Sequence, residues 1–182
     1  DKYEFTKKSF DTFDILIGWR FVEKKNFLEL IDLLKLLSVN WLVRKIGIVW
    51  DGKLLVKIIS KINELGLWEL VKKHGFLKHK DLLIVLREYN CFINYSKKSS
   101  SWDDEGIPNL ILENILSWNL IFSSITGWIW ELLSSESKNS LSVDINIDFG
   151  RIKSFFESKD LIQETIIKDY SKVTSMYAKE NA

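Results

Sequence analysis

The chain has 182 residues and a mass of 21.4 kDa, which fits one domain that buries about 70% of the surface its unfolded chain exposes. With 26 Lys and Arg against 25 Asp and Glu, the net charge of +1 supplies no global field, and this argues against a nucleic-acid partner. A content of 46% hydrophobic and 13% aromatic residues excludes a disordered chain. The single cysteine, Cys91, excludes an intrachain disulfide.

The first half of the chain carries helical periodicity. Residues 27–37 repeat apolar side chains at helical spacing, and so do residues 54–65, which end at Gly66. Asn40 is a good helix cap, so we expect a short helix after it. Alternation over residues 46–50 before the Asp51-Gly52 pair instead indicates a hairpin strand, but the helical pattern downstream favours a helix that begins near Asp51.

The middle of the chain is predicted to hold two more helical pieces and a loop. A short helix spans residues 68–73 and a longer one residues 80–95. Residues 96–107 lose periodicity and gain serine and charge, which indicates an exposed loop. We therefore expect a single helical domain over residues 1–182, with this loop as its only candidate internal boundary.

Residues 110–133 form the most apolar stretch, with no Lys or Arg and only two acidic residues, Glu113 and Glu131. Pro108 suits the first turn of a helix, so the pattern predicts a helix over residues 108–134. Its length also permits membrane insertion or a groove for a partner or ligand. Because its polar residues fall close to one line, we favour the centre of a helical bundle, with Ile121 and Ile125 in the core.

The C-terminal third begins with strict alternation over residues 141–149, which predicts a half-buried strand. Its partner would be residues 46–50, the start of the chain, or another molecule. Residues 152–170 then predict one or two closing amphipathic helices. The expected fold class is therefore all-α, a multi-helix bundle around the helix at 108–134 with one short strand at 141–149.

Candidate chemical sites are weak. The spacing of His74 and His79 does not place them on one helical face, so we expect no metal site. Cys91 lies beside apolar residues and is expected to be a small buried side chain rather than a nucleophile. The 8 glycines are scattered singly and form no phosphate-binding loop. The sequence thus predicts no catalytic residue, no cofactor and no metal.

These patterns favour a non-enzymatic module for protein–protein interaction, such as a structural subunit or adaptor, with a protein partner or self-association. Tryptophan is enriched at binding hot spots, so the expected partner-binding residues are Trp19, Trp41, Trp68 and Trp102. A basic patch that could contact an acidic partner or phosphates comprises Lys72, Lys73, Lys78 and Lys80. The alternative is a helical carrier of a lipid-like ligand or a membrane-associated protein. Met176 is the only methionine, so we expect Asp1 to be a processed N-terminus or the edge of an excised domain, and the sequence indicates no compartment.

Overall fold

The computed structural model describes residues 8–18, 20–49, 52–97, 109–126, 129, 131–133 and 139–180. In these residues six strands form one parallel sheet in the order β3-β2-β1-β4-β5-β6. The strands are β1 Phe13–Gly18, β2 Val43–Val49, β3 Val71–Gly75, β4 Cys91–Asn94, β5 Leu120–Ser124 and β6 Ser140–Leu141. The expected all-α bundle is therefore wrong, and the fold is α/β.

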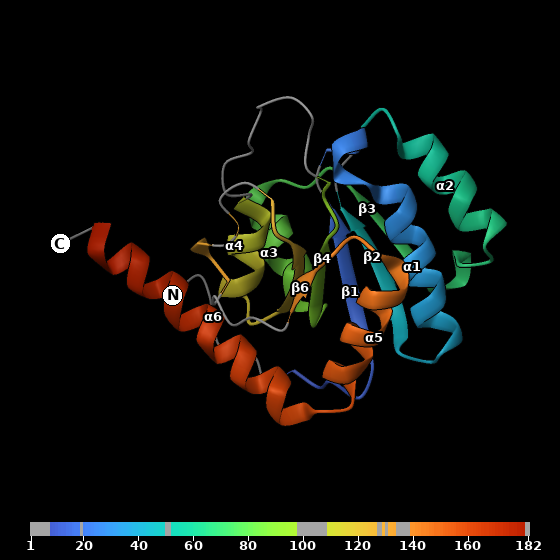
Figure 1. Cartoon of the computed structure of the whole chain (residues 1–182). Helices are drawn as coiled ribbons and strands as arrows, with labels where there is room; N and C mark the ends of the chain where they lie inside the picture. The colour runs from blue at the N-terminus through green and yellow to red at the C-terminus, as the bar shows by residue number, and fades with distance from the viewer. Residues whose placement is uncertain are drawn as a thin grey trace.

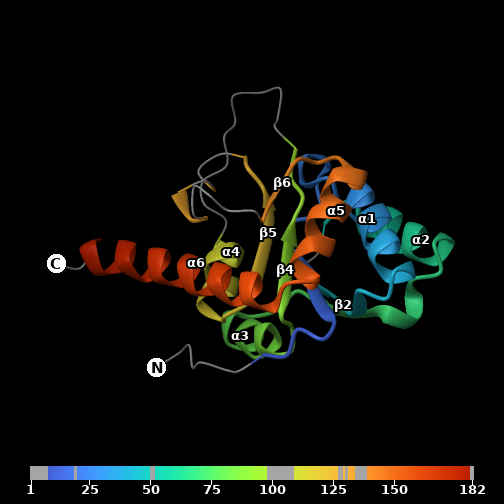
Figure 2. The same ribbon diagram turned by 60° about the horizontal axis from the view of Figure 1, so that its bottom comes forward.

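Helices cover both faces of the sheet (Figures 1 and 2). The helices are α1 Phe27–Val39, α2 Leu55–Glu64, α3 His79–Arg87, α4 Asn109–Leu116, α5 Ile145–Phe156 and α6 Lys159–Glu180, with 3-10 turns η1 Glu23–Lys25 and η2 Trp68–Leu70. Helices α1, α2 and α5 pack in the core on one face, and α3 and α4 pack on the other. Helix α6 begins against the first core and ends in the second. None of the described helices is long and apolar enough to span a bilayer.

The central strand explains why the sheet was missed. All six residues of β1 are buried, because β1 has helices on both faces and pairs with β2 and β4 at its two edges. Ile15 and Ile17 enter one core, and Leu16 enters the other. A parallel strand covered on both faces reads as a continuous apolar run without period-two alternation. The sequence of β1 therefore carries no pattern that distinguishes it from a buried helix.

The helix expected at 108–134 is also wrong, because α4 ends at Leu116 and the chain turns back as β5. Trp118 has a left-handed φ of 60°, and the Asn119 amide donates to the carbonyl of Asn114 at 3.0 Å, which closes the helix end. The next five residues, Leu120–Ser124, form a fully buried strand between β4 and β6. Two short buried elements in succession produced the apolar stretch that resembled one long helix.

The strand expected at 141–149 is wrong beyond its first residue, Leu141. Only Ser140 and Leu141 pair with β5, and α5 starts at Ile145. The Asp144 side chain caps that helix by accepting hydrogen bonds from the amides of Asn146 and Ile147. Alternation here arose from a loop followed by an amphipathic helix rather than from a sheet.

Of three further predictions one is wrong and two are wrong in part, and the rest of the helical pattern is confirmed. No helix follows Asn40, where Trp41 adopts a φ of 62° in a turn before β2. The predicted piece at 68–73 is η2 followed by β3, and the helix predicted at 80–95 divides into α3 and β4. The helices predicted at 27–37 and 54–65 are confirmed as α1 and α2, and the closing helices as α5 and α6.

Candidate functional site

The order of the strands places a natural ligand site at the carboxyl ends of β1 and β4. The chain after β1 continues into α1 on one face, whereas the chain after β4 leads to α4 on the other. In open parallel sheets this reversal leaves a crevice outside the strand ends, and ligands bind there. Gly18 ends β1 and Asn94 ends β4.

Gly18 permits an unusually close approach at this position. A Cβ on Gly18 would lie 2.2 Å from Val49 Cγ2 and 3.3 Å from Leu110 Cδ2. The end of β1 therefore touches both the end of β2 and the first turn of α4. Free amide groups at a helix start attract anions, so α4 directs a partial positive charge toward the reversal point.

The loop between β1 and α1 adds cationic side chains. Arg20 is exposed two residues after Gly18, and Lys25 in η1 is only 3% exposed. The loop after β2 is pressed against this one, since a Cβ on Gly52 would lie 2.5 Å from the Phe21 nitrogen. The Leu54 amide also donates to the Phe21 carbonyl at 3.2 Å. The loops after β1 and β2 thus pack against each other at this edge, and Arg20 adds an exposed cation to the loop after β1.

The segment after β4 is bonded to the loop after β1 and to α1. The Lys97 amide donates to the Lys24 carbonyl at 2.9 Å, and the Lys97 ammonium pairs with the Glu29 carboxylate on α1. Glu29 also accepts from Asn26 Nδ2 at 2.9 Å. The hydrogen bond from Lys97, with that from Asn26, lowers the pKa of Glu29. These contacts hold the two sides of the reversal point together.

Polar side chains continue across the ends of β4 and β5. Asn94 Nδ2 donates to Ser123 Oγ at 2.9 Å, and Ser96 Oγ donates to Asn94 Oδ1 at 2.9 Å. Ser124 Oγ donates to the Ser96 carbonyl at 2.6 Å. At the carboxyl ends of β4 and β5, these side chains are therefore joined by hydrogen bonds and not by apolar contacts.

A side-chain contact joins the start of α3 to the second turn of α4. His79 Nε2 lies 3.1 Å from Glu113 Oε1, and the Glu113 side chain is mostly buried. Burial raises the pKa of Glu113, while His79 acts in the opposite direction. The only sequence signal for this pair was a carboxylate inside an apolar stretch. Its histidine partner could not be identified, because the two residues belong to different helices.

Of the four tryptophans predicted to bind a partner, the two that the structure describes, Trp41 and Trp68, lie away from this edge. Trp19 and Trp102 fall outside the described residues. Trp41 is 85% exposed just before β2, and Trp68 is 43% exposed just before β3, so both lie near the amino ends of their strands. The ring of Trp68 has the Lys73 ammonium 5.1 Å from its centroid. Their role in binding a partner stays a prediction.

The predicted basic patch spans the edge strand and the next helix. Lys72 and Lys73 lie on β3, Lys78 precedes α3 and Lys80 lies within it. Lys72 pairs with Glu88 at 3.0 Å, and this contact lowers the pKa of Glu88. A role for this patch in binding also stays a prediction.

The remaining candidates from the sequence are structurally ordinary. Cys91 is fully buried in β4, and burial raises the pKa of its thiol, so its predicted role as a small buried residue is confirmed. His74 and His79 lie on different elements, β3 and α3. Within the described ranges, His, Cys, Asp and Glu form no group of three suited to a metal ion.

Solved structures of other proteins have a fold similar to that of this chain. No model of a protein family matches the chain, and no curated protein matches it. Among solved structures, S. aureus TarM, crystallised as a variant with fondaparinux, α-GlcNAc-glycerol and UDP, superposes with a TM-score of 0.76 at 20% identity over 98% of this chain and 36% of that one.

Two shorter structures match over most of their length. The C-terminal domain of the glycosyl transferase group 1 family protein LpcC from Francisella tularensis gives a TM-score of 0.74 at 17% identity over 91% of this chain and 86% of that one. The catalytic domain of the Helicobacter pylori cholesterol-α-glucosyltransferase gives 0.71 at 14% identity over 90% and 99%. The chain thus spans about a third of TarM but nearly all of these two domains.

These matches overturn the functional expectation. The interaction module and the adaptor were inferred from the tryptophan content, the low net charge and the lack of an evident active site, and the carrier from apolar helices of a bundle that this chain does not form. The three solved structures described above, which share its fold, come from glycosyltransferases and not from non-enzymatic adaptors. The chain has the α/β fold of a GT-B glycosyltransferase domain.

Proposed function

We propose that this chain is the nucleotide-sugar-binding domain of a glycosyltransferase and holds a UDP-sugar at the carboxyl ends of β1 and β4. The observation that carries the proposal is the match over 98% of the chain to a transferase crystallised with UDP. The match to an isolated C-terminal domain supports a self-contained folding unit. In the longer relatives the remaining length would supply the acceptor side of the reaction.

The diphosphate would lie beside Gly18. Arg20 offers a planar guanidinium that can bind two phosphate oxygens at once, and α4 directs its N-terminal turn to the same place. Lys25, almost completely buried in η1, lies in the same loop. Absence of a side chain at Gly18 lets the end of β1 pack closely against Val49 and Leu110, which brings the start of α4 beside it.

Hydroxyl groups of the ligand would form hydrogen bonds with the pair of His79 and Glu113. His79 Nε2 lies 3.1 Å from Glu113 Oε1, which orients the carboxylate in the second turn of α4. A carboxylate is the natural acceptor for the hydroxyl protons of ribose or of the transferred sugar. Phe76, 67% exposed in the segment between β3 and α3, offers a ring near the same edge on which a base could stack.

The proposed chemistry assigns a stabilising role to the cations. When the sugar is transferred, the bond from its anomeric carbon to the phosphate oxygen breaks, and an acceptor hydroxyl replaces that oxygen. Negative charge then accumulates on the leaving diphosphate. Arg20, Lys25 and the N-terminal turn of α4 would stabilise this charge without rearrangement, which is how fixed positive groups accelerate such reactions.

Calorimetric titration with UDP tests the proposal directly. We expect saturable binding by the wild-type chain and binding at least about ten-fold weaker for Arg20→Ala, because a charge-assisted contact to phosphate is lost. Lys168→Ala, an exposed site on α6, is the matched control and should bind UDP like the wild type. Failure of the wild-type chain to bind UDP, or equal losses in both variants, would contradict the proposal.

A further inference from the structure

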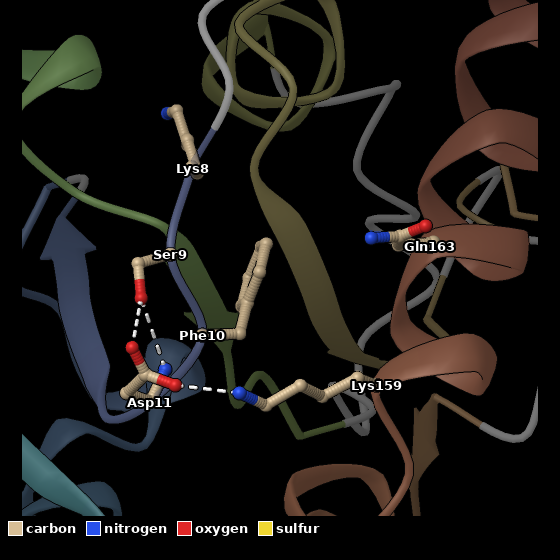
Figure 3. Close-up of a pocket in the computed structure, with 6 residues that line it drawn as sticks. All are labelled: Lys8, Ser9, Phe10, Asp11, Lys159 and Gln163. Carbon is tan, nitrogen blue, oxygen red and sulfur yellow. Dashed lines mark hydrogen bonds and ion pairs between the residues drawn. The ribbon is translucent and has the colours of Figure 1, made fainter.

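A cavity lies away from the proposed nucleotide site, where the segment before β1 meets the start of α6 (Figure 3). Its volume is about 350 Å³, within the range of roughly 300–1,000 Å³ typical of small-ligand sites. It is lined by Lys8, Ser9, Phe10, Asp11, Lys159 and Gln163. The amino ends of the strands are on this side, opposite the reversal point described above.

The walls of the cavity combine one aromatic ring with hydrogen-bonding groups. Phe10 is partly buried against the first core, and the Gln163 amide points toward its ring from the other side (Figure 3). The Lys159 ammonium bridges to Asp11 Oδ1 at 2.5 Å, and Ser9 Oγ donates to Asp11 Oδ2 at 2.6 Å. The bond from Lys159 lowers the pKa of Asp11, so the carboxylate is ionised at neutral pH. The wall of the cavity therefore carries both hydrogen-bond donors and acceptors.

Both lysines that line the cavity already have partners. Lys8 Nζ points away from it (Figure 3) and donates to the carbonyls of Leu86 at 3.2 Å and Tyr89 at 2.6 Å and to Asn119 Oδ1. The three hydrogens of its ammonium group are thereby used. Burial, with a contribution from Arg87, lowers the pKa of Lys8 to about 7, which further reduces its charge. Lys159 is paired with Asp11, so this cavity is poorly suited to an anion.

We propose that this cavity is a second carbohydrate-binding site, which holds one sugar ring against Phe10 with its hydroxyls bonded to Gln163, Asp11 and Ser9. A pyranose presents an apolar C–H face that packs on an aromatic ring, and each of its hydroxyls both donates and accepts. A neutral ligand of this kind matches the mixed polar lining. The choice of ligand rests in part on the proposed function, because a glycosyltransferase encounters glycans.

The position of the site separates it from the reacting sugar. The donor would bind at the carboxyl ends of the strands, whereas this cavity opens near the start of α6. It would therefore hold a distant unit of a polymeric acceptor or product. Such a site would raise the local concentration of the polymer without taking part in bond formation.

Chemical-shift mapping of the ¹⁵N-labelled chain tests the inference. N-acetylglucosamine and glucose are the sugar probes, and inorganic phosphate is the anionic probe. We expect saturable shifts with at least one sugar at the amides of residues 8–11 and 159–163. Absence of such shifts with both sugars, or shifts there with phosphate alone, would overturn the inference.

Variants on α6 supply the matched comparison. Gln163→Ala should weaken sugar binding about five-fold through the loss of one hydrogen bond, whereas Glu164→Ala, exposed and outside the cavity, should bind like the wild type. Gln163 is preferred to Phe10 because Phe10 also packs on the core. Equal sugar affinity in the two variants would contradict the placement of the site.

Titration of the same samples with UDP distinguishes the two proposals. Gln163→Ala should retain wild-type UDP affinity. Sugar binding without UDP binding would contradict the proposed nucleotide site and support the proposed sugar site. UDP binding without sugar binding would contradict the sugar site alone.

Discussion

Gly47 lies directly beneath the ring of Tyr89. A Cβ on Gly47 would come within 2.3 Å of Tyr89 Cζ, and Tyr89 is almost completely buried. The Tyr89 hydroxyl lies 2.7 Å from His74 Nε2 on β3, and the Lys45 ammonium lies 4.5 Å from the ring centroid. Burial raises the pKa of the Tyr89 hydroxyl, so it remains protonated in the folded protein. The absence of a side chain at Gly47 in β2 thus allows the Tyr89 ring to pack over β2 and to reach His74 on β3.

Gly47→Ala should therefore destabilise the fold by about 1–3 kcal/mol, because the added methyl group must displace Tyr89 from His74. Gly150→Ala is the matched control, since a Cβ at that position on α5 meets no heavy atom within 4 Å. Alanine there should be neutral or stabilising by up to about 1 kcal/mol. Urea denaturation measures both changes, and similar losses in the two variants would refute the packing described.

Ile121 and Ile125 should respond differently to truncation, although both were expected to be central. Ile121 in β5 is fully buried, so Ile121→Ala should lower the free energy of unfolding by about 2–5 kcal/mol. Ile125 follows the strand and is 37% exposed, so Ile125→Ala should cost about 1 kcal/mol or less. Thermal unfolding of the pair checks the strand assignment, which a single helix through both residues would not produce.

Asp148 is predicted to be a major structural carboxylate. It is fully buried and accepts hydrogen bonds from the amides of Ser142 at 2.8 Å and Val143 at 2.9 Å and from Tyr95 Oη at 3.0 Å. Val143 has a left-handed φ of 66°, which is unfavourable for a β-branched residue, and these bonds hold it there.

Asp148→Asn would turn an amide donor toward these donors and should cost about 2–4 kcal/mol. Glu157→Gln, an exposed change at the end of the same helix, should cost less than about 1 kcal/mol. Chemical denaturation compares the two. A change of less than 1 kcal/mol for Asp148→Asn would show that the loop does not depend on this carboxylate.

Lys8 should make stability depend on pH near neutrality. Its pKa is lowered from 10.5 to about 7 by burial, so between these values the unfolded chain binds more protons than the folded one. Stability contributed through this residue should therefore rise with pH above 7, by about 1 kcal/mol from pH 7.5 to 8.5.

The comparison that isolates this effect is with Lys8→Met, which cannot titrate. Urea denaturation at the two pH values should show a rise in wild type that exceeds the rise in Lys8→Met by about 1 kcal/mol. Lys168→Met, an exposed control on α6, should retain the wild-type slope. Equal slopes for wild type and Lys8→Met would show that Lys8 keeps its ordinary pKa.

The sequence predicted the amphipathic helices well and the sheet poorly. Helices α1 and α2 each present one apolar face to a single core, so their period is visible in the sequence. Strands β1 and β5 are buried on both faces and carry no alternation. The turn at Trp118 was not foreseeable either, because tryptophan rarely adopts a left-handed φ.

The proposed nucleotide site was hidden for a related reason. Gly18, Arg20 and Lys25 do not form a glycine-rich loop, and their significance depends on the order of strands in space. Glu113 and His79 come from different helices and meet only in the folded chain. Residue types were visible in the sequence, whereas the reversal of strand order that brings them to one edge was not.

The central position of β1 in the sheet also affects how the chain can fold while it is being synthesised. Strand β1 is the first of the six described strands. One of its edges pairs with β4, through Ile15 and Cys91, so that edge has no partner until β4 has been synthesised. At roughly 5–20 residues per second, the ribosome leaves one side of an apolar strand uncovered for several seconds. Truncation anywhere before β4 would make that exposure permanent, so fragments of the first 90 residues should aggregate rather than fold.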